Sequence, residues 1–110
     1  MPYSQGSIVI GNNPFSNDSK RPYLIISNKR HPFMGEEYLG VVVTTTNREK
    51  AIPINDNNFR KGELPKSSYV SPWCIVTIKD DYIEKNIAIV DNYLIKETYR
   101  ELLHYIDPIN

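Results

Sequence analysis

The chain has 110 residues and a formal net charge of zero, with 40% hydrophobic and 24% charged residues. This composition is typical of one globular domain and excludes an intrinsically disordered chain. The single cysteine, Cys74, excludes an internal disulfide and favours a reducing compartment. No apolar run approaches the roughly 20 residues of a membrane span, and the first residues do not resemble a signal peptide. The sequence therefore predicts one cytoplasmic domain over residues 1–110.

Short apolar runs predict six β-strands before the C-terminal segment. They are expected at residues 8–10, 22–28, 38–46, 51–56, 67–78 and 86–91. The first two are separated by a polar loop rich in Asn, Ser and Pro. Pro53 indicates that the fourth strand lies at a sheet edge, and Pro72 predicts a bulge or bend in the fifth. Residues 57–66 are expected to form a loop.

The C-terminal segment favours a helix. Apolar side chains recur there at helical spacing, at Leu94, Ile95, Tyr99, Leu102, Leu103 and Ile106. Asp91 is expected as the N-cap and Pro108 as the stop. Because the strands follow one another closely with no helices between them, the sequence predicts a compact antiparallel barrel with this amphipathic helix packed on it.

Basic residues are distributed unevenly along the chain. Residues 1–79 carry ten Lys or Arg and six Asp or Glu, whereas residues 80–110 carry three and seven. The basic excess peaks where Lys20, Arg21, Lys29 and Arg30 follow one another with no acidic residue between them. A local basic face can bind phosphate on a protein of zero net charge, although from charge alone ordinary loop surface is the simpler explanation.

Most patterns that would carry chemistry are missing from the sequence. His31 and His104 are far apart, and no Cys-x-x-Cys or His-x-x-x-His spacing supports a metal site. The five glycines are scattered singly, so no glycine-rich phosphate loop is predicted. Cys74 lies in an apolar context, which disfavours its thiolate. We therefore expect neither a metal nor a cofactor.

What remains is Arg21 at the start of the second strand and the triplet Thr44, Thr45 and Thr46 at the end of the third. If these two strands pair antiparallel, the arginine and the threonines converge at one rim of the barrel. A guanidinium with nearby hydroxyls suits a phosphate, although β-propensity alone also accounts for the threonines. Pro22 confines Arg21 to an extended backbone, which reduces the freedom of the cation.

These segments, in this order, resemble the MazF/PemK family of toxin ribonucleases. The resemblance rests on "GSIVI", "KRPYLIIS" and "VVVTTT", and it extends through "SYV" and "NIAIVD" to the closing helix. It implies a mainly β fold, a small SH3-like antiparallel barrel of the CcdB/MazF type with a C-terminal α-helix. It also implies a homodimer, metal-independent cleavage of single-stranded RNA such as mRNA, and a cognate antitoxin protein that blocks the site.

Carried over by position, the resemblance implies that Arg21 is the catalytic arginine and Thr44 the catalytic threonine. Thr45 and Thr46 occupy the next two positions. Because Thr46 replaces a usual glutamine, the alignment to the family leaves open, by one position, which of the three threonines is the catalytic one. Trp73 and Cys74 stand where the family often has Asp-Gln, a departure that bears on base recognition and leaves the arginine chemistry intact.

Further residues are expected near the substrate. His31 is either a second acid or base or a loop histidine hydrogen-bonded to backbone. Lys20, Lys29 and Arg30 are expected to share the electrostatic attraction of RNA.

The mechanism implied is attack by the RNA 2′-hydroxyl on the adjacent phosphorus, which leaves a 2′,3′-cyclic phosphate and a 5′-hydroxyl. Arg21 would stabilise the growing charge and Thr44 would donate to a non-bridging oxygen. Two alternatives stay open: a non-catalytic toxin of the same fold that binds a protein target, as gyrase-inhibiting toxins do, and an RNA-binding module without cleavage. The presence of both Arg21 and a threonine favours the ribonuclease, because a protein binder needs neither.

Overall fold

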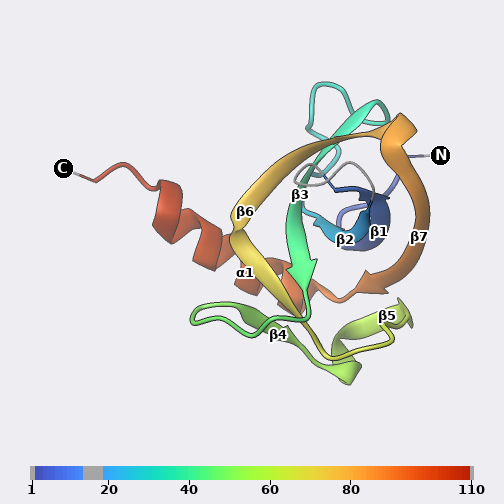
Figure 1. Cartoon of the computed structure of the whole chain (residues 1–110). Coiled ribbons are helices and arrows are strands. Elements are labelled where there is room, and N and C mark those ends of the chain that lie inside the picture. The colour runs from blue at the N-terminus through green and yellow to red at the C-terminus, as the bar shows by residue number, and fades with distance from the viewer. Residues whose placement is uncertain (1, 14–18, 110) are drawn as a thin grey trace.

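The protein, for which we analysed a computed structural model that describes residues 2–13 and 19–109, is built on one curled antiparallel sheet (Figure 1). Within these residues the sheet has seven strands in the order β4-β6-β3-β2-β1-β7-β5, and the single α-helix follows the last strand. The strands are β1 (Ser7–Asn12), β2 (Lys20–Ile25), β3 (Glu37–Thr44), β4 (Ile52–Ile54), β5 (Phe59–Gly62), β6 (Ser68–Lys79) and β7 (Ile83–Val90), and the helix is α1 (Asn92–Ile106). The predicted mainly β fold with a C-terminal helix is confirmed.

Two details of the predicted strands are confirmed. Strand β4, which contains Pro53, lies at one edge of the sheet. Strand β6 is bulged, because Val42 of β3 pairs with Ser71 whereas Val41 pairs with Ile75. Residues 72–74 therefore have no partner in β3, and the extra chain length bends β6 across the sheet.

The expected loop at residues 57–66 is wrong in part. Residues 56–58 form a short 3-10 turn, and Phe59–Gly62 form β5, which pairs with β7. The run "FRKG" has no apolar alternation, so only its tertiary partner makes it a strand. Gly62 has φ 67°, and a Cβ there would collide with the Ile87 carbonyl oxygen. The loop expected between the first two strands falls largely on residues 14–18, outside the described residues.

The central strands β2 and β3 are buried on both faces, because successive side chains point to opposite sides of the sheet. Leu24 and Val41 belong to one core, which α1 covers through Leu94. Tyr23 and Val42 belong to a second core on the opposite face. All four side chains are at most 4% exposed. A site at the ends of these strands is therefore held by a rigid, doubly packed support.

Helix α1 packs on the sheet only through its first half. Its N-cap is Asp91, whose carboxylate accepts from Leu94 N at 3.0 Å, as expected. Leu94 and Thr98 are buried, but Tyr99 and Ile106 are each 61% exposed. The expected packing of the whole apolar stripe is therefore wrong for the second half, because α1 runs past the sheet there (Figure 1). No helix in the described part of the chain has the length and apolar character needed to span a membrane.

Candidate functional site

The pairing of β2 with β3 brings Arg21 and Thr44 to the same end of the sheet. The register pairs Tyr23 with Val42 and Leu24 with Val41. Continued by two residues beyond Tyr23, this register places Arg21 opposite Thr44. Because side chains alternate along a strand, Arg21 and Thr44 lie on the same face as Tyr23 and Val42. The convergence expected from the sequence therefore follows from the strand pairing itself.

The guanidinium of Arg21 has an unused donor. Among buried side-chain nitrogen and oxygen atoms of residues 2–13 and 19–109, Arg21 Nε is the one without a hydrogen-bond partner. Its neighbour in β1 is Gly11, which adds no side chain on this face. A Cβ at Gly11 would lie 3.2 Å from the Tyr82 carbonyl oxygen. A buried, unpaired N–H costs about 1–3 kcal/mol, so Nε leaves the cation only partly satisfied within the chain, and Arg21 as a whole is half-buried.

Tyr23 supports the arginine from the same face of β2. Its ring is 1% exposed, and its hydroxyl donates to the Asn12 carbonyl oxygen at 2.7 Å. Burial raises the pKa of Tyr23 above its usual value, and the nearby positive charge of Arg21 opposes part of that rise. Tyr23 therefore stays a neutral donor that fixes the end of β1 beside Arg21.

Thr44 is the last residue of β3, and its hydroxyl is oriented by the turn that follows. Its Oγ1 accepts from Thr46 N at 3.1 Å. A hydroxyl keeps one hydrogen to donate after it has accepted a bond, so Thr44 can still donate to a ligand. Thr45 and Thr46 are exposed and lie beyond the end of β3. Among the three threonines, the strand register puts Thr44 opposite Arg21.

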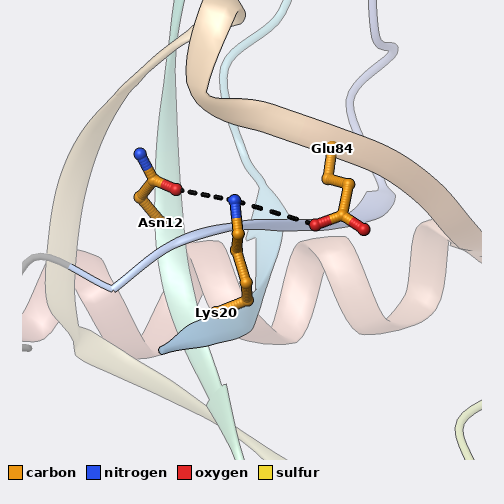
Figure 2. A network of polar contacts seen from close by, with 3 residues as sticks. All are labelled: Asn12, Lys20 and Glu84. Atoms are coloured by element: carbon orange, nitrogen blue, oxygen red, sulfur yellow. Dashed lines mark hydrogen bonds and ion pairs between the residues drawn. The ribbon is translucent and has the colours of Figure 1, made fainter. Parts of the chain in front are cut away.

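Lys20 lies on the other face of β2 from its neighbour Arg21. Its Nζ donates to Asn12 Oδ1 at 2.9 Å and pairs with Glu84 Oε2 at 3.7 Å (Figure 2). The side chains of Lys20 and Glu84 are about half exposed, so this ion pair contributes little to stability. It does hold the Lys20 ammonium on β1 and β7, away from the face that carries Arg21 and Thr44.

The remaining candidates lie at the opposite end of β2. Four residue steps, roughly 13 Å of extended strand, separate Arg21 from Ile25, and residues 29–31 follow beyond that end. There His31 Nδ1 accepts from Phe33 N at 3.0 Å, and the two rings meet edge to face. Lys29 and Arg30 are exposed beside it and line a separate hollow of about 370 Å³. Within one chain, the structure does not bring Lys29, Arg30 or His31 to Arg21.

Strand pairing places two further residues beside the site. Tyr69 of β6 pairs with Thr44, so its ring shares the face of the site. Gly11 pairs with Arg21 and leaves space beside it. Both positions depend on strand register, which a single sequence does not display. In the described ranges 2–13 and 19–109, no three His, Cys, Asp or Glu side chains gather as metal ligands would.

The comparisons with known proteins show that this chain is similar in structure to proteins whose structures have been solved. No family model and no curated protein matches the sequence. An endoribonuclease in complex with its cognate antitoxin, from a mycobacterial species, matches with TM-score 0.74 at 18% identity over 99% of this chain and 98% of that one. Toxin MazF-mt6 of Mycobacterium tuberculosis matches with TM-score 0.73 at 20% identity over 94% and 99%. MazF in a MazE-MazF structure from Deinococcus radiodurans matches with TM-score 0.74 at 14% identity over 99% of both chains. The chain therefore has the fold of the MazF toxins.

Proposed function

We propose that this protein is a toxin endoribonuclease that cleaves single-stranded RNA without a metal ion. The observation that carries the proposal is the β2–β3 register, which, continued two residues beyond Tyr23 and Val42, sets Arg21 opposite Thr44 on one face of a MazF-type sheet. The endoribonuclease and the toxin among the similar structures support the same activity. The arrangement offers a fixed cation and a neutral donor to one phosphate, and its chemistry needs no metal ligands.

The reaction is an internal transfer within the RNA. The 2′-oxygen forms a bond to phosphorus while the bond from phosphorus to the 5′-oxygen breaks. The proton lost from the 2′-hydroxyl is balanced by the proton gained at the 5′-oxygen. Charge grows on the non-bridging oxygens in between, where Arg21 supplies a permanent cation and Thr44 a hydrogen bond. The rigid support under both residues lets them act without rearranging.

The other predicted residues have different parts in this proposal. Lys20 is held by Asn12 and Glu84 on the opposite face, so it fixes the strand ends and does not touch the reacting phosphate. His31 has Nδ1 occupied by a backbone N–H at the far end of β2, so the loop-histidine role is favoured over the acid or base role. Lys29 and Arg30 at that end would act through long-range attraction of RNA.

The proposed setting is a cytoplasmic homodimer that a cognate antitoxin holds inactive. Tyr99, Leu103 and Ile106 on the second half of α1 are exposed, and a partner chain would cover this stripe. An antitoxin is present in the mycobacterial complex of similar structure. Light scattering should give the mass of a dimer, and a fully active monomer would contradict this part of the proposal.

The activity is tested with purified protein, a long RNA and EDTA, followed by mapping of the new 5′ ends. We expect discrete cuts with 5′-hydroxyl ends, and no cut where the scissile 2′-hydroxyl is replaced by hydrogen. Arg21→Ala prepared in parallel excludes a contaminating nuclease. Dependence on added Mg²⁺ or 5′-phosphate products would overturn the mechanism. RNA that is bound but never cut would favour the RNA-binding module, and neither binding nor cutting would favour a protein target.

A further inference from the structure

A second feature of the molecule is a shallow hollow beside the bulge of β6. It has a volume of about 290 Å³ and is lined by Arg48, Glu49, Lys50, Trp73 and Tyr105. Arg48 and Lys50 come from the loop between β3 and β4, Trp73 from the unpaired residues of the bulge, and Tyr105 from the end of α1. Three separate segments therefore gather two aromatic rings and two cations at one place.

Within this hollow the Arg48 guanidinium lies over the Trp73 ring. The Arg48 guanidinium carbon lies 5.4 Å from the centre of the Trp73 ring, within the range of a cation–π contact. Tyr105 is 45% exposed, and its hydroxyl is held by Glu101 at 3.1 Å. Arg48 is exposed and Trp73 is half-buried, so both residues reach the solvent in this hollow.

The loop that carries the cations is held in an unusual conformation. The Ala51 N–H donates to the Arg48 carbonyl oxygen at 3.0 Å, which closes a tight turn. Lys50 lies inside that turn with φ 74°, and no other non-glycine residue in the described ranges has a positive φ. A side chain in this region is strained, and such strain persists where the surroundings hold it. The turn thus fixes Lys50 and Arg48 on the rim of the hollow.

The hollow is close to the proposed reaction site. Arg48 follows Thr44 by four residues, and Trp73 follows Tyr69, the strand partner of Thr44, by four residues. Four residues of chain reach at most about 14 Å. A short single strand of RNA can therefore extend from the phosphate at Arg21 and Thr44 toward the hollow.

We infer that this hollow is a nucleobase subsite, in which an unpaired base of the RNA strand stacks on Arg48, Trp73 and Tyr105. Unpaired bases bind proteins by stacking on aromatic rings and guanidinium planes, with basic side chains meeting the adjoining phosphates. Lys50 is placed to meet such a phosphate, and Glu49 to accept from an exocyclic amino group of the base. The inference rests on the proposed function for its substrate, and it assigns Trp73 a role in choosing the bound sequence.

Trp73 is the only tryptophan of the chain, so its fluorescence reports on this hollow alone. The experiment titrates the full-length protein with a single-stranded 2′-O-methyl RNA, which cannot be cleaved, and with an abasic oligomer of equal length. We expect saturable quenching by the first and little change with the second, which has the phosphates and lacks the bases. Arg21→Ala should reach the same quenching at saturating RNA, at a modestly higher RNA concentration.

Variants separate stacking from general attraction. Trp73→Ala should weaken binding roughly 5- to 100-fold, and Trp73→Phe should recover most of it. Arg48→Ala should also weaken binding, because it removes the guanidinium on which the base stacks. The matched controls are Tyr93→Ala, an exposed aromatic at the start of α1, and Arg60→Ala, on the far edge strand β5. Both should bind as the wild type does.

The outcomes distinguish this inference from the proposed activity. Wild-type cleavage with unchanged Trp73 fluorescence would overturn the subsite and leave the ribonuclease standing. Quenching of Trp73 without any cleavage would support the subsite and overturn the ribonuclease activity. The subsite would also be overturned if the abasic oligomer quenched Trp73 as strongly as the 2′-O-methyl RNA does. The same holds if Trp73→Ala binds RNA more weakly only because its oligomeric mass has changed. If Trp73→Ala does not fold, the wild-type titration and Arg48→Ala decide the question.

Discussion

The two ends of the β2–β3 pair differ in what their polar groups are free to do. At one end Arg21 has an unpaired donor and Thr44 a hydroxyl with a hydrogen to give. At the other end His31 already accepts from the backbone, and Lys29 and Arg30 lie on an exposed loop. Both ends are basic in the sequence, but only the first combines a cation with a fixed neutral donor on a doubly packed support. Positive charge alone therefore does not locate a phosphate site in this molecule.

The same comparison holds between adjacent residues. Lys20 and Arg21 are neighbours in the chain, yet Lys20 is paired with Glu84 on one face while Arg21 lies on the other. Adjacent side chains of a strand point to opposite faces of the sheet, and side chains several residues apart are separated by the rise of the strand. We therefore expect substitutions at these positions to have very different effects on RNA cleavage.

The largest effect is expected from Arg21→Ala. Loss of one preorganised donor typically costs roughly 10²–10³ in rate, and single-turnover cleavage measures it. Arg21→Lys should recover only part, because an ammonium does not reproduce the two-pronged contact. Arg21 Nε has no partner to abandon, so the free energy of unfolding should stay within about 0.5 kcal/mol.

Lys20→Ala is the matched control for this substitution. It removes the adjacent cation on the other face and should leave the rate of the chemical step nearly unchanged, with only a modest loss of RNA affinity. An equal loss of cleavage in both variants would show that total charge matters and the face of the strand does not. Unfolding of Arg21→Ala would instead assign the arginine a structural role.

The next largest effect is expected from Thr44→Val, which keeps the shape and removes the hydroxyl. We expect cleavage to fall by about 10²-fold, at the lower end for a lost donor, since the group is neutral. The bond from Thr46 N to Thr44 Oγ1 is lost as well, at a cost of about 0.5–1.5 kcal/mol in stability. Thr45→Val, at an exposed position, should cleave normally. A reversed pattern would shift the catalytic register by one residue.

A small effect is expected from His31→Ala at the other end of the strands. A general base normally contributes 10²–10⁴ in rate, and we expect no loss of that size. The variant loses the hydrogen bond from Phe33 N, so its melting temperature should fall slightly. A loss of cleavage in the general-base range, with a changed pH profile, would bring His31 into the chemistry through a second chain.

The smallest effect concerns Tyr23. Burial raises its pKa and Arg21 opposes that rise, so Arg21→Ala should raise the pKa further, while Lys20→Ala should not. The neutral phenol stabilises the fold at pH values below the unfolded-state pKa of about 10, and this stability is lost as pH rises through the higher folded-state pKa. A tyrosine titration of each variant, with Tyr23→Phe to identify the signal, measures the shift. No difference between the two variants would mean that the charge of Arg21 is not felt at Tyr23.

Much of the fold followed from local patterns. The β-branched run of β3, the proline at the edge in β4 and the capped helix were all readable in the sequence. The exception was β5, because "FRKG" has no strand pattern and is held by its pairing with β7. The exposed second half of α1 also escaped prediction, since a helical stripe does not show where the sheet beneath it ends.

The part of the candidate site that depends only on strand pairing could be predicted from the sequence. Arg21 and Thr44 lie at the same end of the sheet because an antiparallel pair brings the start of one strand to the end of the next. Lys20, Lys29, Arg30 and His31 lie apart from that pair within one chain, because closeness along the sequence does not decide the face of a strand or the end at which a residue lies. The contact of Arg48 with Trp73 depends on a bulge and a crossing loop, and no local pattern signals it.

The central claim is that Arg21 and Thr44 act on one phosphate, and a double-mutant cycle tests it most directly. Single-turnover cleavage is measured for the wild type, Arg21→Ala, Thr44→Val and the double variant. Groups that act as a unit are strongly non-additive, so the double variant should be little slower than Arg21→Ala alone. Losses that multiply, as they do for distant independent sites, would show that the two residues do not share a phosphate and would contradict the site described above.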